Sequence, residues 1–508
     1  MKGVIAAGHE VTAEAGARIL RAGGNAFDAA LAAMFASTVP EAILSSVGGG
    51  GFLMSHPAGS ANKKPILYDF FVDMPRVKRP DDELDFHGIH ADFGPATQEF
   101  HIGVGSAATP GIVPGAYAVH EDLCTMSMAE ILSPAIEAAR EGVRVNAFQA
   151  YLYTIVEPIL RASPAIEALF APDGALLKEN NIFRNVALSE TYEALAREGA
   201  ALFTTGEVGR AILDQSSSRG GYLTAADLDH YKVIKREPLI RSHGGMEIAL
   251  NPAPAQGGAL IAYGLGLIEE ITRTKDVPIG IETLVKVMEL TNEARARHGA
   301  DLEAHLGRDI ISGHIEQASK HRSSTRGTTH ISVVDELGNA ASLTLSNGEG
   351  CGHMVGDCGL MLNNMLGEED LNPDGFHLWE PGQRLSTMMS PTIISGSQGE
   401  LLALGSGGSN RIRTAILQVI HYFIDLGLDL DAAIHHPRLH LERDGVLSFE
   451  DLFDDATRQR IIGGSNRSHP WPEPNMFFGG VNSVERGPLG ELLGVGDERR
   501  GGTAIILD

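Results

Sequence analysis

The chain has 508 residues and a formal net charge of −25; 43% of its residues are hydrophobic and 21% are charged. This composition is typical of a globular protein and excludes a disordered or fibrous one. At about 150 residues per domain, the length allows about three domains, or fewer if they are large. An acidic surface repels phosphate groups, so neither nucleic acid nor an anionic membrane is expected as a partner.

The first residues lack the charged segment and apolar stretch that mark a secretory leader, and no run of eighteen apolar residues occurs. The sequence therefore predicts a cytoplasmic protein, or an extracytoplasmic one if a leader has been removed. The three cysteines, Cys124, Cys351 and Cys358, are too few for a disulfide framework. Cys351 and Cys358 lie near His353, but this spacing fits no zinc motif, so neither a metal nor another cofactor is expected.

Two helices are predicted at the start of the chain. Thr12 is the expected N-cap of a helix over 13–22, and Asn25 that of a second helix over 26–37. Four glycines follow at 48–51; they indicate either a turn with positive φ or a backbone packed closely against a site. No P-loop, complete G-x-G-x-x-G, G-x-S-x-G or H-E-x-x-H motif is present, which removes the usual support for nucleotide, α/β-hydrolase and zincin functions.

The middle of the chain is dominated by helical patterns, and the remainder by strands. Helices are predicted over 129–141, 186–198 and 281–296, and a further one over 412–426. The polar, poorly periodic stretch 313–327 is expected to be exposed and mobile.

A β-hairpin is predicted directly after this stretch. Residues 328–335 and 339–346 alternate like strands, and the three residues between them include Gly338 for a left-handed position. If Asp335 pairs with Asn339, the register places Thr328 opposite Ser346. Two hydroxyl groups are therefore expected side by side at the start of the hairpin.

A threonine at such a junction has a specific possible chemistry. Its hydroxyl can attack the carbonyl of Gly327, and hydrolysis of the resulting ester releases Thr328 as a new N-terminus. The freed amine, with an ordinary pKa of about 8, can serve as the base for its own hydroxyl. A glycine at position 327 tolerates a strained backbone. An ordinary threonine-rich strand pair remains the alternative.

Motifs along nearly the whole chain give this hypothesis a family context. They are GGNAFDAA (23–30), GGGGF (48–52), PGIVPG (110–115), LTAADL (223–228), PAQGG (254–258), GTTH (327–330), SVVD (332–335), GNA (338–340), LNN (362–364), MSPT (389–392) and DERRGG (497–502). In these motifs and their order the chain resembles the γ-glutamyltransferase (γ-glutamyl transpeptidase) family of the N-terminal nucleophile hydrolases.

The resemblance implies an α+β fold, a four-layer αββα sandwich, and autocleavage before Thr328. The products would be a helix-rich large chain, 1–327, and a small chain, 328–508, which stay associated as one composite domain. The family nucleophile corresponds to Thr328, and the hydroxyl that orients it corresponds to Ser346. The oxyanion donors are expected from a glycine pair in the segment GSGGSNR at 405–411, either Gly407 and Gly408 or Gly408 and Ser409.

The substrate-binding residues match the family less well. Val72 stands where the family has the arginine that binds the glutamyl α-carboxylate, and Gly348 stands where it has an asparagine. The hydroxyl pair that assists the same carboxylate is retained as Ser386 and Thr387.

The α-amino group of the substrate is expected to meet Asn364 and an acidic residue. The candidates for the acidic residue are Glu368 and its neighbours up to Asp370. His9, Glu10 and Glu293 are expected to be surface or helix-packing residues, because this mechanism needs no side-chain base.

Three functions remain open at this point. The first is an autoprocessing hydrolase or transferase of small γ-glutamyl amides of the glutathione type, with water or an amine as acceptor. The second is an amide hydrolase similar to the cephalosporin acylases, with a different acyl group. The third is an inactive binding or scaffold protein.

Overall fold

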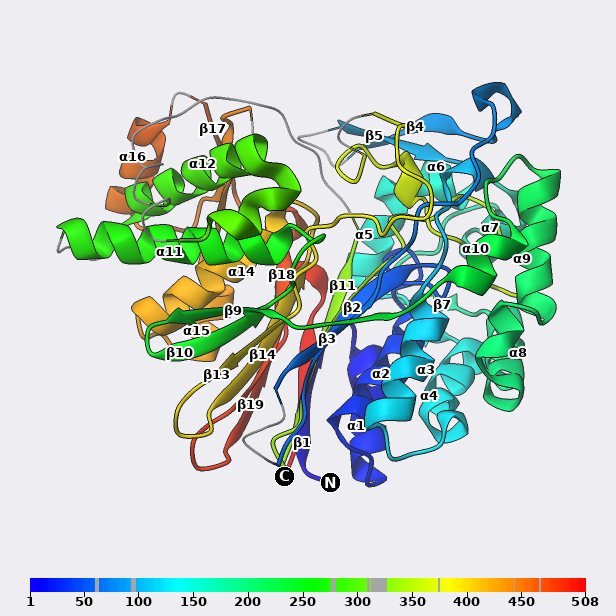
Figure 1. Ribbon diagram of the computed structural model, residues 1–508, viewed down its shortest axis with the longest axis horizontal. Helices are drawn as coiled ribbons and strands as arrows, with labels where there is room; N and C mark the ends of the chain where they lie inside the picture. Colours follow the sequence, from blue (N-terminus) through cyan, green and yellow to red (C-terminus); the bar gives the residue numbers. More distant parts are fainter. Residues whose placement is uncertain are drawn as a thin grey trace.

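The computed structural model describes residues 1–59, 64–92, 97–275, 280–307, 311, 327–372, 375–442, 444–465 and 467–508. Two β-sheets lie face to face in the middle of the molecule, and helices cover the outer face of each (Figure 1). This is the predicted four-layer αββα sandwich. Of the polar stretch 313–327, only Gly327 belongs to the described residues, so the prediction of a mobile segment lies outside them.

The first sheet has seven strands, and the predicted hairpin lies in it. Its order is β20 (Thr503–Leu507), β1 (Gly3–Ala7), β11 (Thr329–Asp335), β12 (Ala340–Ser346), β2 (Gly50–His56), β3 (Ile66–Phe70) and β8 (Ile234–Arg236). The second sheet has six strands, in the order β19 (Leu492–Val495), β18 (Gly480–Arg486), β14 (Leu401–Gly407), β13 (Thr392–Ser395), β10 (Met246–Leu250) and β9 (Leu239–His243). The sheets meet where β11 packs on β14 and β18, so the hairpin lies at the centre of the sandwich.

Helices from different parts of the chain form the outer layers. α1 (Glu10–Arg21) and α2 (Ala26–Ser37) pack on the first sheet, where α2 contacts β11 and β12. α11 (Gly257–Lys275) and α14 (Arg411–Ile420) cover the second sheet, with α12 (Ile281–His298) packed on α11 (Figure 1). None of the helices in the described ranges is long and apolar enough to cross a membrane.

The remaining elements extend these layers. The other helices are α3 Ile112–Leu123, α4 Met128–Glu141, α5 Ala147–Ile155, α6 Glu157–Leu160, α7 Pro164–Phe170, α8 Val186–Glu198, α9 Glu207–Ser218, α10 Ala225–His230, α15 Leu430–His435 and α16 Asp455–Gly464. The small sheets are formed by β4 His87–Asp92 with β5 Thr97–Ile102, by β6 Val143–Arg144 with β7 Ile182–Phe183, and by β15 Leu439–Leu441, β16 Leu447–Glu450 and β17 Ser468–Trp471.

Most predicted helices are present, and their ends show what the sequence pattern missed. Asn25 caps α2 as predicted, since its side chain accepts hydrogen bonds from the amides of Phe27 and Asp28. The prediction of Thr12 as the first N-cap is wrong: α1 begins at Glu10, and His9 caps it through the amide of Val11. The hydroxyl of Thr12 instead donates to the buried carboxylate of Glu41 at 2.7 Å.

The helix predicted over 412–426 is shorter than expected. α14 ends at Ile420, and a single π-helical turn, His421–Asp425, follows it. A π turn of five residues is too short to be recognised from a hydrophobic pattern.

The hairpin has the predicted register. Thr329 pairs with Leu345 and His330 with Thr344, and Gly338 has a φ of 88° in the connecting loop. The glycines at 48–51 do not form a turn of positive φ. Gly50 pairs with Ser346, and a Cβ on Gly49 would lie 2.3 Å from the Ser346 carbonyl oxygen. These glycines therefore let the backbone approach the end of β12 closely.

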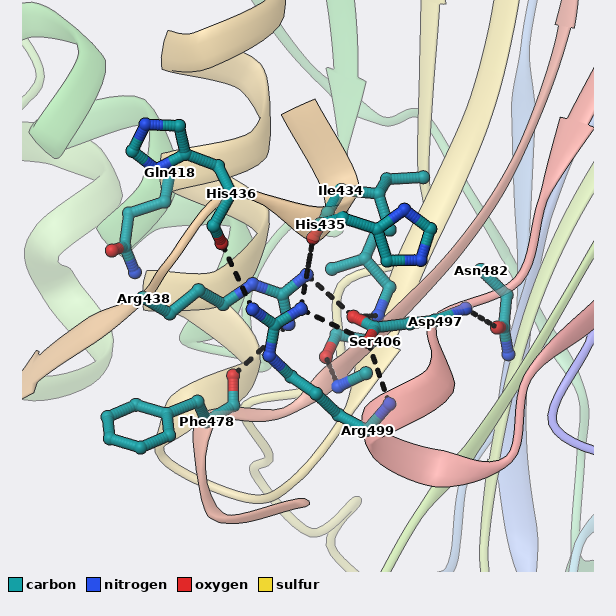
Figure 2. A network of polar contacts seen from close by, with 12 residues as sticks. Ser406, Gln418, Ile434, His435, His436, Arg438, Phe478, Asn482, Asp497 and Arg499 are labelled. Carbon is teal, nitrogen blue, oxygen red and sulfur yellow. Dashed lines mark hydrogen bonds and ion pairs between the residues drawn. The ribbon is translucent and has the colours of Figure 1, made fainter. Parts of the chain in front are cut away.

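A buried network of charged side chains fastens the C-terminal segment to β16 and to the residue before β15 (Figure 2). Asp497 accepts hydrogen bonds from Arg438 at 2.6 Å and from Arg499 at 3.2 Å, and Arg499 also pairs with Glu450 at 2.6 Å. All four side chains are at most 2% exposed. The network fixes the short helical turn Glu498–Arg500, and this places Arg500 beside the hairpin.

Candidate active site

The peptide bond between Gly327 and Thr328 lies next to two hydroxyl groups. Thr328 Oγ1 donates a hydrogen bond of 2.6 Å to the carbonyl oxygen of Gly327, and Ser346 Oγ donates one of 2.9 Å to the same oxygen. Ser346 Oγ also accepts from the amide of Gly348 at 3.1 Å, which fixes its orientation. Both hydroxyl-bearing residues are buried. Both hydrogen bonds polarise the carbonyl group. The Ser346 hydroxyl can also stabilise negative charge on this oxygen, whereas a Thr328 oxygen that attacks the carbonyl gives up its proton.

The backbone on both sides of this bond is held by charged residues. Glu349 Oε1 accepts from the amide of Gly327 at 2.8 Å, and Arg500 Nη1 donates to the carbonyl oxygen of Thr328 at 3.3 Å. Burial lowers the pKa of Arg500 to about 10, so it is a cation at neutral pH. Thr329 donates to the carboxylate of Glu41, and burial raises the pKa of that carboxyl group to about 7. The sequence does not indicate these three charged residues, because Glu41 and Arg500 are far from Thr328 in the chain and Glu349 lies just beyond the predicted hairpin.

Close packing of the backbone favours glycine at position 327. It does not have a positive φ. A Cβ at this position would lie only 2.8 Å from the carbonyl oxygen of Gly348. Close approach of two backbone segments, and not a left-handed conformation, therefore favours glycine here.

The expected oxyanion turn joins β14 to α14. Gly408 has a φ of 118° and Ser409 a φ of 56°, so a non-glycine residue takes a left-handed conformation at the second position. No acceptor for the amides of Gly408 and Ser409 is found in the described part of the chain. Gly407 is already paired with Gly480 in the sheet, and the carbonyl of Thr328 packs against it. Of the two predicted pairs, the geometry favours Gly408 and Ser409.

A pocket that opens to solvent contains the two hydroxyl groups. Its lining residues are Phe71, Gln256, Arg295, Gly327, Thr328, Ser346, Glu368, Asp370, Leu371, Ser386, Thr387, Met388, Met389, Ser409 and Ile412. The structure thus brings the predicted residues Thr328, Ser346, Ser386, Thr387, Glu368 and Ser409 together around one cavity.

Asn364 does not line this pocket. It is fully buried, and its side-chain oxygen accepts from the amides of Glu349, at 2.9 Å, and Gly350, at 3.2 Å. Asn364 therefore supports the loop that carries Glu349. It was predicted to face the cavity, but it does not. Among the acidic candidates, Glu368 and Asp370 line the pocket, whereas Glu369 is exposed outside it.

The two departures from the family pattern are both embedded in packed structure. Val72 is fully buried among apolar side chains, and its carbonyl oxygen accepts from the amide of Leu385. Gly348 has a φ of 62°, and a Cβ on it would lie 2.1 Å from Asn364 Oδ1 and 2.2 Å from Glu368 Oε1. An asparagine at 348 therefore does not fit this arrangement.

The other polar candidates lie outside the pocket. His9 caps α1, Glu10 is exposed, and Glu293 is buried in α12. His353 Nε2 lies 3.2 Å from a carboxylate oxygen of Asp85. Within the described ranges, no group of three or more histidine, cysteine or acidic side chains is placed to hold a metal ion.

Two central sheets between helical layers, with a hydroxyl residue at the start of a central strand and facing a pocket, define the class of N-terminal nucleophile hydrolases. Comparison with known proteins gives the family. The model of the gamma-glutamyltranspeptidase family matches residues 12–507. The chain belongs to this family.

Its relatives include both transpeptidase-type and acylase-type proteins. It is 28% identical to the glutathione hydrolase proenzyme of Bacillus subtilis, over 99% of this chain and 91% of the relative. It is 29% identical to the acylase ACY 1 proenzyme of a Pseudomonas species, over 100% of this chain and 94% of the relative. The crystal structure of the cephalosporin acylase from Bacillus halodurans has the same fold, with a TM-score of 0.85 at 21% identity over 100% of this chain and 96% of that one.

Family membership confirms the prediction of an N-terminal nucleophile hydrolase or transferase related to proenzymes. The relatives named here are a hydrolase and an acylase, which supports the two enzymatic hypotheses over that of an inactive scaffold. The relatives do not separate the two enzymatic hypotheses, because both kinds of protein match with similar identity.

Proposed function

We propose that the chain cleaves itself between Gly327 and Thr328. Thr328 Oγ1 attacks the carbonyl carbon of Gly327, the bond to the Thr328 nitrogen breaks, and the hydroxyl proton passes to that nitrogen. Water then hydrolyses the ester, which leaves a carboxylate on Gly327 and a free amine and hydroxyl on Thr328. The observation that carries this proposal is the pair of hydrogen bonds from Thr328 and Ser346 to the Gly327 carbonyl oxygen, at 2.6 and 2.9 Å.

The same residues serve turnover after cleavage. The α-amine of Thr328 accepts the proton of its own hydroxyl while the oxygen attacks the amide carbon of the substrate. The amides of Gly408 and Ser409 stabilise the oxyanion, and the leaving amine takes up the proton. Water, or a second amine, then cleaves the acyl ester and regenerates Thr328.

We propose a γ-glutamyl amide as the substrate. The Thr387 hydroxyl can donate to a carboxylate, whereas the Ser386 hydroxyl donates to the Pro254 carbonyl and would have to turn to do so. Glu368 and Asp370 supply negative charge for an ammonium group, and all four residues line the pocket. The second candidate is an acylase that takes a different acyl group. The buried Val72 favours it, because the arginine expected at this position is missing.

The test is release of 4-nitroaniline by the purified protein from γ-glutamyl, glutaryl and butyryl 4-nitroanilides, with mass spectrometry of the quenched small chain. The proposal predicts that γ-glutamyl is the preferred acyl group and that it is found as an ester on Thr328. Preference for glutaryl would identify an acylase. A chain that is never acylated on Thr328 would contradict the proposed mechanism.

A further inference from the structure

We propose that Arg295 binds the carboxylate of the acyl group and takes the place of the arginine that the family carries at position 72. The inference rests on the proposed function, because it concerns the pocket that contains Thr328. It makes Arg295 a specificity-determining residue, and it defines the substrate class as amides whose acyl group ends in a carboxylate.

The position of Arg295 in the pocket is the first observation. Arg295 lies in the last turn of α12 and is only 6% exposed, yet it lines the same cavity as Thr328 and Ser346. Among the described lining residues it is the single lysine or arginine. A guanidinium group with so little contact with water binds a carboxylate more strongly than an exposed one. An anionic acyl group in this pocket therefore meets a cation at this point.

A chain of two hydrogen bonds links the guanidinium of Arg295 to the backbone of Thr387. Arg295 Nε donates to Gln256 Oε1 at 3.0 Å, and the amide of Gln256 donates to the carbonyl oxygen of Thr387 at 2.8 Å. Ser386 is tied to the same region, because its hydroxyl donates to the carbonyl of Pro254 at 2.7 Å. The cation and the hydroxyl groups expected to hold the carboxylate are thus joined through residues 254–256.

A third hydrogen bond connects Arg295 to the turn that carries the oxyanion donors. Its Nη1 donates to Asn410 Oδ1 at 2.8 Å, and Asn410 directly follows Ser409. Arg295 therefore lies between the hydroxyl pair and the oxyanion turn. An acyl chain whose carbonyl occupies the oxyanion site would have its far end within this same region.

Val72 lies close to the hydroxyl pair in the structure. The Val72 carbonyl accepts from the amide of Leu385, the residue just before Ser386, so position 72 borders the hydroxyl pair from the side of the first sheet. Arg295 enters the same pocket from α12, in the helical layer over the second sheet (Figure 1).

The acidic side of the pocket sets a second feature of the substrate. Asp370 Oδ2 accepts from Ser409 Oγ and from Asn410 Nδ2, each at 3.0 Å. Asn410 thus contacts the cation through its oxygen and the anion through its nitrogen. A cation and an anion that contact the same amide side chain complement an acyl group that carries a carboxylate and an ammonium group on one carbon, as γ-glutamyl does.

The test measures kcat/KM of the processed enzyme for γ-glutamyl, glutaryl and butyryl 4-nitroanilides. Butyryl is the uncharged control, since it is glutaryl without the carboxylate. We expect R295M to lower kcat/KM for both carboxylate-bearing substrates about 10- to 100-fold relative to butyryl. R295K keeps the charge but cannot bind a carboxylate through two parallel hydrogen bonds. Its kcat/KM for the carboxylate-bearing substrates, relative to butyryl, should lie between the values of R295M and the wild type. R297M, which changes an exposed arginine in the same turn of α12, should leave the ratios unchanged.

Inhibition of the wild type keeps the inference testable if the Arg295 variants do not fold. Glutarate should inhibit at least about 10-fold more strongly than butyrate. Equal inhibition, or an active R295M with the wild-type substrate ratios, would overturn the role of Arg295 and leave the proposed function intact. A wild-type enzyme that releases nitroaniline from none of the three substrates would overturn the proposed function and this inference with it.

Discussion

Ser346 donates a hydrogen bond of 2.9 Å to the carbonyl oxygen of Gly327, which precedes it by nineteen positions in the chain. The contact joins the end of β12 to the residue before β11, and it depends on the register of the hairpin between them. It places a donor on the oxygen that becomes negative when Thr328 attacks.

The first prediction concerns this donor. S346A should slow autocleavage about 100-fold or more, because removal of one donor from a developing oxyanion has an effect of this size. The measurement is the fraction of uncleaved chain on denaturing gels over time after purification. S342A is the matched control: Ser342 is buried in the same strand, but its hydroxyl donates to the carbonyl of Leu404. Equal slowing in both variants would show that Ser346 acts only through stability.

The second prediction concerns the residue before the cleavage point. G327A should also impair cleavage, because its Cβ would lie 2.8 Å from the Gly348 carbonyl oxygen and displace the scissile carbonyl from Ser346. G307A adds the same methyl group where nothing lies within 4 Å, and it should cleave normally. Cleavage of G327A at the wild-type rate would contradict the close packing described for this position.

The third prediction concerns the pH dependence of stability. Burial raises the pKa of Glu41 from 4.5 to about 7, so the folded protein binds this proton more tightly than the unfolded chain does. Protonated Glu41 therefore stabilises the folded protein. This stabilisation is fully present below the pKa of Glu41 in the unfolded chain, and it is lost as the pH rises through its pKa in the folded protein. Between these two pKa values the free energy of unfolding falls by about 3 kcal/mol.

The variant E41Q removes this ionisation. Relative to the parent protein, its free energy of unfolding should therefore increase by about 3 kcal/mol between pH 4.5 and 7. Guanidinium unfolding, with both proteins in a T328A background so that each remains one chain, gives the comparison. A difference that does not change with pH would show that Glu41 has an ordinary pKa.

The fourth prediction separates buried from exposed ion pairs. D497A should destabilise the protein by about 3–5 kcal/mol, because it leaves Arg438 and Arg499 buried without their shared carboxylate (Figure 2). D444A breaks an ion pair with Arg467, whose side chain is 59% exposed. It should lower the free energy of unfolding by at most about 1 kcal/mol. Thermal unfolding of the two variants provides the test, and equal losses would contradict the role given to the network.

The sequence predicted the local features of the site well. The register that places Thr328 beside Ser346 follows from a three-residue loop and strict alternation, both of which are local. Asn25 was identified as a cap because its partners lie within three residues. Thr12 was misassigned for the opposite reason, since its partner Glu41 comes from a distant part of the chain.

The rest of the site depends on contacts that no local pattern contains. Glu349, Arg500 and Arg295 reach the pocket or the scissile bond from three separate segments. Asn364 was expected in the pocket from its place in a motif, but its side chain is turned toward the backbone of residues 349 and 350. A motif fixes where a residue lies in the chain, and packing decides which way its side chain faces.

Intact mass spectrometry of freshly made protein, followed over time beside T328A, tests the central claim most directly. We expect the wild type to change from one chain into two, 1–327 and 328–508, with threonine at the N-terminus of the smaller one. T328A should remain a single chain without activity toward any of the amides. A wild type that stays uncleaved yet hydrolyses them, or a T328A variant that retains activity, would contradict the account.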